Sequence, residues 1–158
     1  MKVIYLIMIL FYMFLNTACN LLPTRLPEKR PADLRVSYSY MSGRGLYGEY
    51  LRITSKKCTY EKRYKSITTS FDFIITEKNL DTLYRKLYEN AFDRIGTYKR
   101  MIYDRSGVSV SVTFNKNNFR KSNSASFGVR VTSMKNWNAV LHAISKVKND
   151  AIKAKEVS

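Results

Sequence analysis

The sequence predicts an α+β fold: one antiparallel sheet of about seven strands with two helices packed on one of its faces. Two observations lead to this fold class. Apolar and polar residues alternate through residues 34–75 and again through 108–131, which is the period of strands. After each of these blocks, apolar residues recur at the 3.6-residue spacing of a helix. The expected order is therefore four strands, a helix, three strands and a second helix.

Four strands are expected in the first block, because residues 34–40 alternate cleanly and short turns follow. A glycine-rich turn at 42–45 leads to a second strand at about 47–54, and two more are expected at about 57–64 and 68–75. Connections this short predict an antiparallel meander.

The first helix is expected to begin after Thr76, whose side chain can cap it. Its apolar stripe consists of Leu80, Leu83, Tyr84, Leu87 and Tyr88. After a loop containing Gly96, three further strands are expected at about 108–114, 119–123 and 125–131.

Ser133 is expected to cap the second helix, and the lysines after Lys146 suggest that its C-terminal end frays into solvent. The apolar stripe of this helix is Trp137, Val140, Leu141, Ile144 and Val147. On the sheet, aromatic and branched residues are expected beneath the helices, and the alternate positions form a polar face open to water. That face is expected to include Ser37, Ser39, Ser109, Ser111, Thr113 and Arg130.

The N-terminus has the pattern of an export signal, because Lys2 precedes the uninterrupted apolar run 3–15. A helix of this length spans only about 20 Å, which is short of a hydrocarbon core of about 30 Å. Residues 1–18 are therefore interpreted as a signal peptide. Three prolines, at 23, 27 and 31, follow closely, so residues 19–33 are expected to form an extended tether and residues 34–158 a single domain.

The run Leu15-Asn16-Thr17-Ala18-Cys19 resembles the lipobox of bacterial lipoproteins, although Asn16 stands where that family usually has leucine. Looser lipoboxes of this kind are usual in the Bacteroidota. The resemblance implies that Cys19 is diacylated and becomes the mature N-terminus. Because Asn20 is not the aspartate that retains some lipoproteins at the inner membrane, the expected location is the outer membrane, facing either the periplasm or the cell surface.

Two later stretches, 92–98 and 103–107, also look like small Bacteroidota lipoproteins. Those proteins couple a tyrosine-rich sheet, a helix, a turn of the D-R-x-G kind and a C-terminal helix with a tryptophan, here Trp137. The resemblance implies a lipoprotein with this fold, and it supplies no catalytic residue.

The composition excludes several classes of site. One histidine and two cysteines do not suffice for a zinc ribbon, a multi-histidine metal cage or a disulfide framework, so no metal or cofactor is expected. Cys58 alternates with tyrosines along a strand and is expected to be buried and inert. The spacing Gly43-x-Gly45-x-x-Gly48 matches a dinucleotide fingerprint, but it lies between two strands and is expected to form a hairpin.

No catalytic constellation stands out. His142 is expected to face solvent, on the side of its helix opposite the apolar stripe, and the carboxylates are scattered singly among basic residues. The chain is therefore expected not to be an enzyme but a binding or accessory module of the cell envelope. An envelope hydrolase with an unrecognised active site is the alternative.

The net charge of +16 is the strongest compositional signal. It fits either a solvated basic surface or an anionic partner, such as lipopolysaccharide phosphates, phospholipid headgroups or an acidic protein. The export signal argues against nucleic acid, and the oligomeric state is left open. The candidate contact residues, expected to form one patch, are Arg94, Lys99, Arg100, Arg105, Arg120, Lys121 and Arg130.

Overall fold

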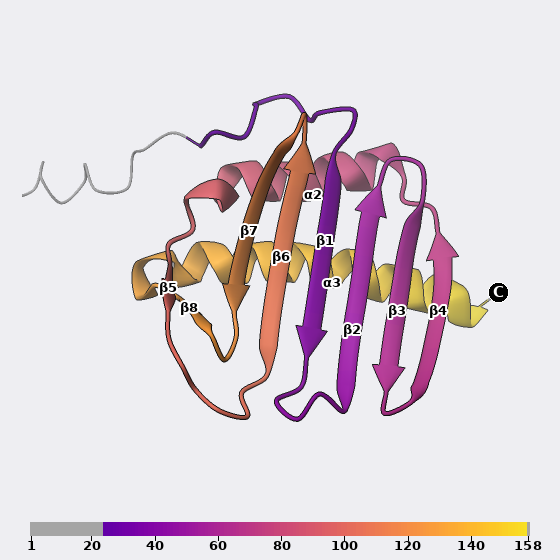
Figure 1. The fold of residues 1–158 in the computed structure, drawn as a ribbon. Coiled ribbons are helices and arrows are strands. Elements are labelled where there is room, and N and C mark those ends of the chain that lie inside the picture. Colours follow the sequence, from indigo (N-terminus) through magenta and orange to yellow (C-terminus); the bar gives the residue numbers. More distant parts are fainter. Residues whose placement is uncertain (1–23, 158) are drawn as a thin grey trace, which may run out of the picture.

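The computed structural model describes residues 24–157 (Figure 1). The expected signal peptide and Cys19 lie outside the described residues. The described chain contains six long strands, two short strands, two α-helices and two single-turn 3₁₀ helices. The elements are β1 (Arg35–Met41), β2 (Tyr47–Thr54), β3 (Cys58–Tyr64), β4 (Ile67–Phe73), α2 (Glu77–Glu89), η1 (Phe92–Arg94), β5 (Thr97–Lys99), β6 (Gly107–Phe114), β7 (Asn117–Asn123), β8 (Phe127–Val129), η2 (Val131–Ser133) and α3 (Met134–Val157).

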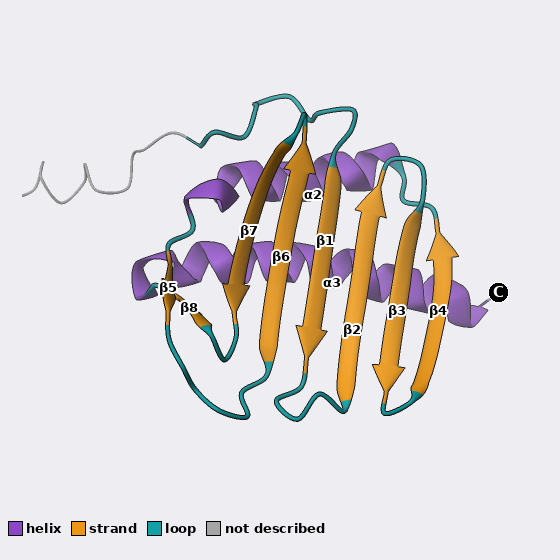
Figure 2. Ribbon diagram, viewed as in Figure 1, coloured by secondary structure: helices purple, strands orange, loops and turns teal. Residues whose placement is uncertain are grey.

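The predicted α+β class is confirmed. Six antiparallel strands form one sheet in the order β4-β3-β2-β1-β6-β7, and both helices lie behind it in the view of Figures 1 and 2. The first four strands make a meander, and β6 then pairs with β1, the first strand of that meander. The face against the helices is called here the covered face, and the other is called the open face.

The strand count and the position of the last strand differ from the prediction. The expected strand at 125–131 shortens to β8, which pairs with β5 in a separate two-stranded sheet. The three residues of β5 are too few to show a period, so the sequence indicated only a loop there. As a consequence, Arg130 follows β8 beside Gly96 and does not lie on the open face of the large sheet.

The two helices begin where the sequence indicates. The Thr76 hydroxyl caps α2 by accepting a hydrogen bond from the backbone N–H of Asn79 at 3.3 Å. η2 ends at Ser133, and α3 follows and continues to Val157. The predicted fraying after Lys146 is therefore wrong. Ala151 lies among the lysines that follow Lys146 and is buried, so the last turns of α3 still pack on the molecule.

The segment 24–33, called here the strap, was expected to be part of a free tether but lies against the domain. Leu26 is buried in the core. The Asp93 carboxylate accepts hydrogen bonds from the Thr24 hydroxyl at 2.5 Å and from the backbone N–H of Arg25 at 2.9 Å. Arg30 pairs with two carboxylates of α2. Pro27 and Pro31 keep the strap free of regular structure, as expected, but residues 24–33 pack on the domain that was expected to begin at residue 34.

The covered face carries the apolar core together with one polar network. Val36, Ile53, Val112 and Trp137 are almost completely buried, and so is Cys58, as predicted. Burial raises the pKa of the Cys58 thiol, which keeps it protonated and unreactive. The core therefore accounts for the apolar pattern of the sequence.

The polar network centres on Glu49. Its carboxylate accepts hydrogen bonds from the Lys148 ammonium of α3 at 2.6 Å and from the hydroxyls of Tyr47 and Tyr60. Burial alone would raise the pKa of Glu49, but the hydrogen bonds from Lys148 and Tyr47 and the charge of Lys148 outweigh it and lower that pKa. Burial, together with the hydrogen bond to Glu49, raises the pKa of Tyr47 to about 12. The network ties α3 to β2 and β3.

Candidate binding groove on the open face

Small and large side chains line up across the open face in two rows. Cross-strand pairing sets Arg52 opposite Ser37, Ser37 opposite Ser111, and Ser111 opposite Arg120. The next row, two residues along the strands, is Tyr50, Ser39, Ser109 and Ser122. Directly paired residues in antiparallel strands point to the same face, so each row is a continuous line of neighbours.

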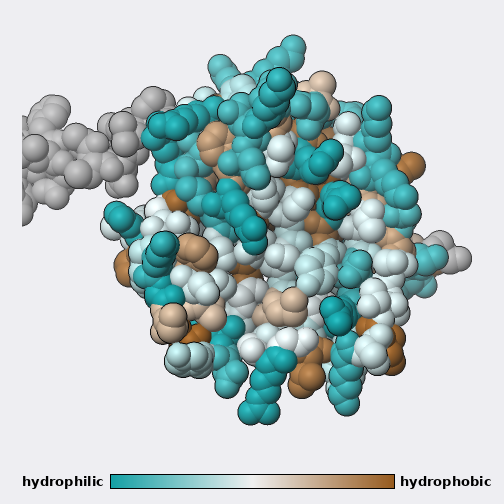
Figure 3. Space-filling model, viewed as in Figure 1, coloured by the Kyte–Doolittle hydropathy of each residue, from teal (hydrophilic) through white to brown (hydrophobic). Residues whose placement is uncertain are grey.

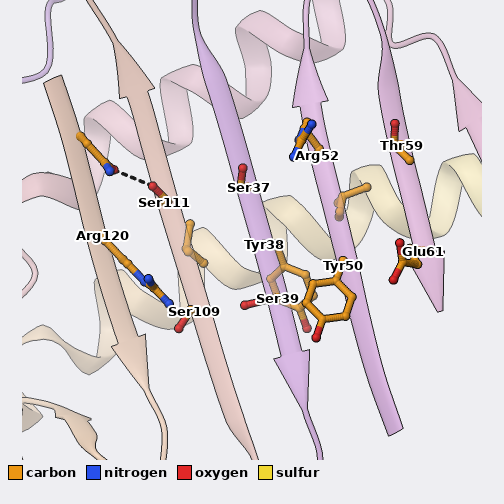
Figure 4. Close-up of a pocket in the computed structure, with 13 residues that line it drawn as sticks. Ser37, Tyr38, Ser39, Tyr50, Arg52, Thr59, Glu61, Ser109, Ser111 and Arg120 are labelled. Carbon is orange, nitrogen blue, oxygen red and sulfur yellow. Dashed lines mark hydrogen bonds between the residues drawn. The ribbon is translucent and has the colours of Figure 1, made fainter. Parts of the chain in front are cut away.

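A block of four serines lies in the middle of these rows and is called here the serine floor: Ser37, Ser39, Ser109 and Ser111. The taller side chains of Arg52 and Tyr50 stand on one side of the floor, and Arg120 stands on the other (Figure 4). This difference in side-chain height hollows the sheet into a groove of about 520 Å³. Three strand spacings of about 4.8 Å separate Arg52 from Arg120, so their α carbons lie about 14 Å apart.

Several polar groups of the groove lack a protein partner among residues 24–157. The hydroxyls of Ser109 and Ser111 donate to Ser122 at 2.9 Å and to Asn118 at 2.7 Å. In contrast, no hydrogen bond or ion pair within that range engages a larger set of groove side chains. That set is Ser37, Ser39, Tyr50, Arg52, Glu61 and Arg120. These groups are open to solvent and are free to bind a ligand.

The charge of the open face is carried by arginine. By strand alternation, its basic positions in the six strands are Arg35, Arg52, Arg63 and Arg120, with no lysine among them. Of the two acidic positions, Asp72 is already paired with Lys57 at 2.8 Å, and Glu61 lines the groove. Arginine presents a planar fork that matches carboxylate and phosphate oxygens, so the groove is suited to an anionic group. Figure 3 shows the centre of this face as mostly pale, neutral residues, bordered by hydrophilic residues and, at the lower and right-hand margins, by hydrophobic ones as well.

The predicted basic patch is dispersed. Arg120 alone of the seven candidates lines the groove. The neighbouring Lys121 points to the covered face, where burial lowers its pKa. Arg94 lies in η1 and pairs with Asp93 at 3.3 Å. The Arg100 guanidinium donates to the Ser124 carbonyl and to the Asn123 side chain, which gives it a structural role.

The remaining candidates lie elsewhere. Lys99 is exposed in β5, Arg105 is exposed in the loop before β6, and Arg130 packs over Gly96. The prediction of one patch is wrong for two reasons. β7 places Arg120 and Lys121 on opposite faces, and β5, which carries Lys99, pairs with β8 in a separate sheet.

Arg52, which stands across the serine floor from Arg120, was not among the residues predicted from the sequence. Alternation in β2 does place Arg52 on the same face as Tyr50, and this signal was available. The pairing of β1 with β6, which sets Arg52 and Arg120 on either side of the serine floor, joins segments about 70 residues apart and has no local signature.

The remaining features of residues 24–157 concern the single histidine, metal ligands and membrane-spanning helices. His142 is exposed, as predicted, and lines a groove between α2 and α3 on the far side of the sheet. No three metal-ligating side chains gather within residues 24–157. No helix in that range has the length and apolar character needed to cross a bilayer.

Comparison with known proteins leaves the resemblance to small Bacteroidota lipoproteins as a prediction. No protein-family model matches the chain, and a search of curated proteins finds no match either.

Proposed function

We propose that this protein is a lipid-anchored component of the cell envelope that binds an anionic partner in the groove on its open face and carries out no catalysis. The partner is a phosphate-bearing envelope component or an acidic protein. The anchor is the lipid expected on Cys19, and the expected location is the outer membrane.

The observation that carries the binding role is the placement of Arg52 and Arg120. Both guanidinium groups are exposed, neither pairs with a carboxylate in residues 24–157, and the serine floor lies between them. A ligand with anionic groups at its two ends can take a bidentate contact from each arginine and hydrogen bonds from Ser37 and Ser39. Among residues 24–157, Glu61 is the only carboxylate that lines the groove, so it has no acidic neighbour there to share acid–base work.

A capture experiment tests the groove. The full chain is immobilised and exposed to detergent-solubilised envelopes, and the retained phosphate-bearing lipids and proteins are measured. The groove variant is Arg52→Glu with Arg120→Glu. The matched control is Lys78→Glu with Arg85→Glu, which changes the same charge at exposed positions of α2 behind the sheet.

We expect the control to retain the same species as the natural chain and the groove variant to lose them. Retention should also weaken as salt rises, because exposed charges are screened over about 8 Å at physiological ionic strength. If the groove variant and the control retain the same species equally, the groove is not the binding site. If the captured species is turned over by the natural chain, the protein is the envelope hydrolase of the alternative hypothesis.

A separate experiment tests the anchor. Cys19→Ala should abolish metabolic labelling with palmitate and move the protein out of the membrane fraction, because the variant has no thiol to acylate at that position. A variant that remains labelled and membrane-bound would show that the lipobox interpretation is wrong.

A further inference from the structure

The loop between β5 and β6 exposes apolar side chains that the core does not use. Met101 is 80% exposed, Ile102 is 42% exposed and Tyr103 is 85% exposed. Three adjacent large apolar residues in one surface loop are unusual, because single exposed apolar residues are common but clusters mark a contact. The loop forms the lower left corner of the molecule in Figure 2.

The loop is held firmly in spite of its exposure. The backbone N–H groups of Arg100 and Ile102 donate to the carbonyls of Ser126 and Ala125, each at 3.0 Å. The Arg100 side chain donates to Ser124 and Asn123 on the same turn. The loop therefore cannot fold its apolar tip back onto the domain without breaking these bonds.

The β1–β2 hairpin braces the other side of the loop. A β carbon at Gly43 would lie 1.9 Å from the carbonyl oxygen of Asp104, so only glycine permits this close approach. The Tyr40 hydroxyl also donates to the Ser106 hydroxyl at 3.4 Å. The close approach to Asp104 explains why residue 43, the first glycine of the fingerprint-like motif, is glycine without any role in nucleotide binding.

Basic side chains flank the apolar tip. Lys99 and Arg105 are exposed and form no ion pair within residues 24–157. Together with Arg100, they set three positive charges against the single negative charge of Asp104, a net +2 for residues 99–105. An apolar tip between cationic residues is the pattern of segments that lie in the interface of an anionic bilayer.

We propose that residues 99–105 dock on an anionic lipid surface, with Met101 and Tyr103 in the headgroup region and with Lys99 and Arg105 on lipid phosphates. Tyrosine suits this position because its ring is apolar and its hydroxyl remains hydrated. Three side chains are too few for a stable protein interface, which buries about 800 Å² on each partner. The choice of a bilayer rests on the proposed envelope location, whereas the contact itself does not involve the groove.

Fluorescence quenching tests this contact in the full chain. An indole is introduced by Tyr103→Trp or, as a matched control, by Ile74→Trp. Ile74 is similarly exposed, at 83%, but it follows β4, which is the edge strand farthest from β7. The natural Trp137 is 1% exposed and gives a constant background. Both variants are bound to vesicles made of equal parts phosphatidylcholine and phosphatidylglycerol, with bromine on the acyl chains.

We expect the indole at position 103 to shift its emission to the blue and to be quenched, while the indole at position 74 is neither shifted nor quenched. Adding Lys99→Glu and Arg105→Glu to Tyr103→Trp should remove the quenching, and so should vesicles of phosphatidylcholine alone. Equal quenching at positions 103 and 74 overturns the proposal, and so does quenching that is the same with charged and with uncharged vesicles.

The groove variant separates this proposal from the proposed function. Arg52→Glu with Arg120→Glu should leave the quenching of the position 103 indole unchanged, because those arginines do not belong to the loop. If the position 103 indole is not quenched in a chain whose groove still captures its partner, the loop contact alone is refuted. If that indole is quenched but the groove captures nothing, the groove alone is refuted.

Discussion

On the covered face of the sheet, the carboxylate of Glu49 accepts hydrogen bonds from three side chains, whereas on the open face the guanidinium groups of Arg52 and Arg120 pair with none among residues 24–157. The difference follows from access to water. A charge between helix and sheet must be paired, because burying it alone is costly. A charge over the serine floor is hydrated and needs no protein partner.

The comparison teaches which polar residues the fold requires. Folding explains Glu49 and Lys148, because their opposite charges form an ion pair between α3 and the sheet. Folding does not explain Arg52 and Arg120, whose side chains form no hydrogen bond or ion pair within residues 24–157. Their alignment across the floor is therefore available for binding, and stability and binding should separate cleanly between the two faces.

The largest expected effect is on the core of the covered face. Trp137→Ala should lower the free energy of unfolding by about 3–5 kcal/mol, because it empties a large buried position. Ser39→Ala on the open face should change it by less than about 0.5 kcal/mol. Urea unfolding followed by circular dichroism measures both. Similar losses for the two variants would mean that the open face is also part of the packed structure.

The next effect concerns charge on the two faces. Lys148→Ala should lower the free energy of unfolding by about 1–3 kcal/mol, because it leaves a mostly buried carboxylate with fewer donors. Arg52→Ala should change it by less than about 0.5 kcal/mol, because Arg52 has no hydrogen-bond or ion-pair partner within residues 24–157 to lose. A destabilisation by Arg52→Ala as large as that by Lys148→Ala would remove the distinction between paired and available charges.

A smaller effect is expected at the strap. Asp93→Ala removes the acceptor of the Thr24 hydroxyl and of the Arg25 N–H, so the start of the strap should detach at a cost of about 1 kcal/mol. Hydrogen exchange of the Arg25 amide should then be faster, while amides in β1 keep their protection. Unchanged exchange at Arg25 would show that Leu26 and Arg30 suffice to hold the strap.

The smallest effect is a pH dependence that differs between the faces. The pKa of Glu49 is lowered by the fold, so its contribution to stability is present above its unfolded pKa and is lost as pH falls through the lowered value. Glu49→Gln should flatten this acid limb of the unfolding free energy. The hydrogen bonds from Lys57 and Thr59 also lower the pKa of Asp72, but at an exposed site. High salt should therefore erase the Asp72 part and spare more of the Glu49 part.

The sequence predicts much of the covered face and little of the groove. Alternation and helical spacing place Val112, Leu87 and Trp137 in the core because burial imposes a period on each element. The strap was not foreseen, since Leu26 among prolines carries no period. Glu49 also escaped notice, because a charged residue in a strand normally indicates a solvent-facing position and its partner Lys148 lies 99 residues away.

The groove depends on register, which alternation alone does not set. Ser37, Ser109 and Ser111 were expected on the open face from their own strands. Their union into one floor requires β6 to pair with β1 at the observed register. A shift of one residue would have turned these serines toward the helices.

The most direct test of the central claim is to map anion contacts residue by residue. Tripolyphosphate is titrated into the full chain labelled with nitrogen-15, and the side-chain N–H signals of the arginines are followed together with the backbone amides. The account predicts that the signals of Arg52, Arg120 and the serine floor shift first and saturate together. Shifts that appear equally at Arg85 on α2, in proportion to exposure alone, would mean that the positive charge is a solvated surface and that the groove is no binding site.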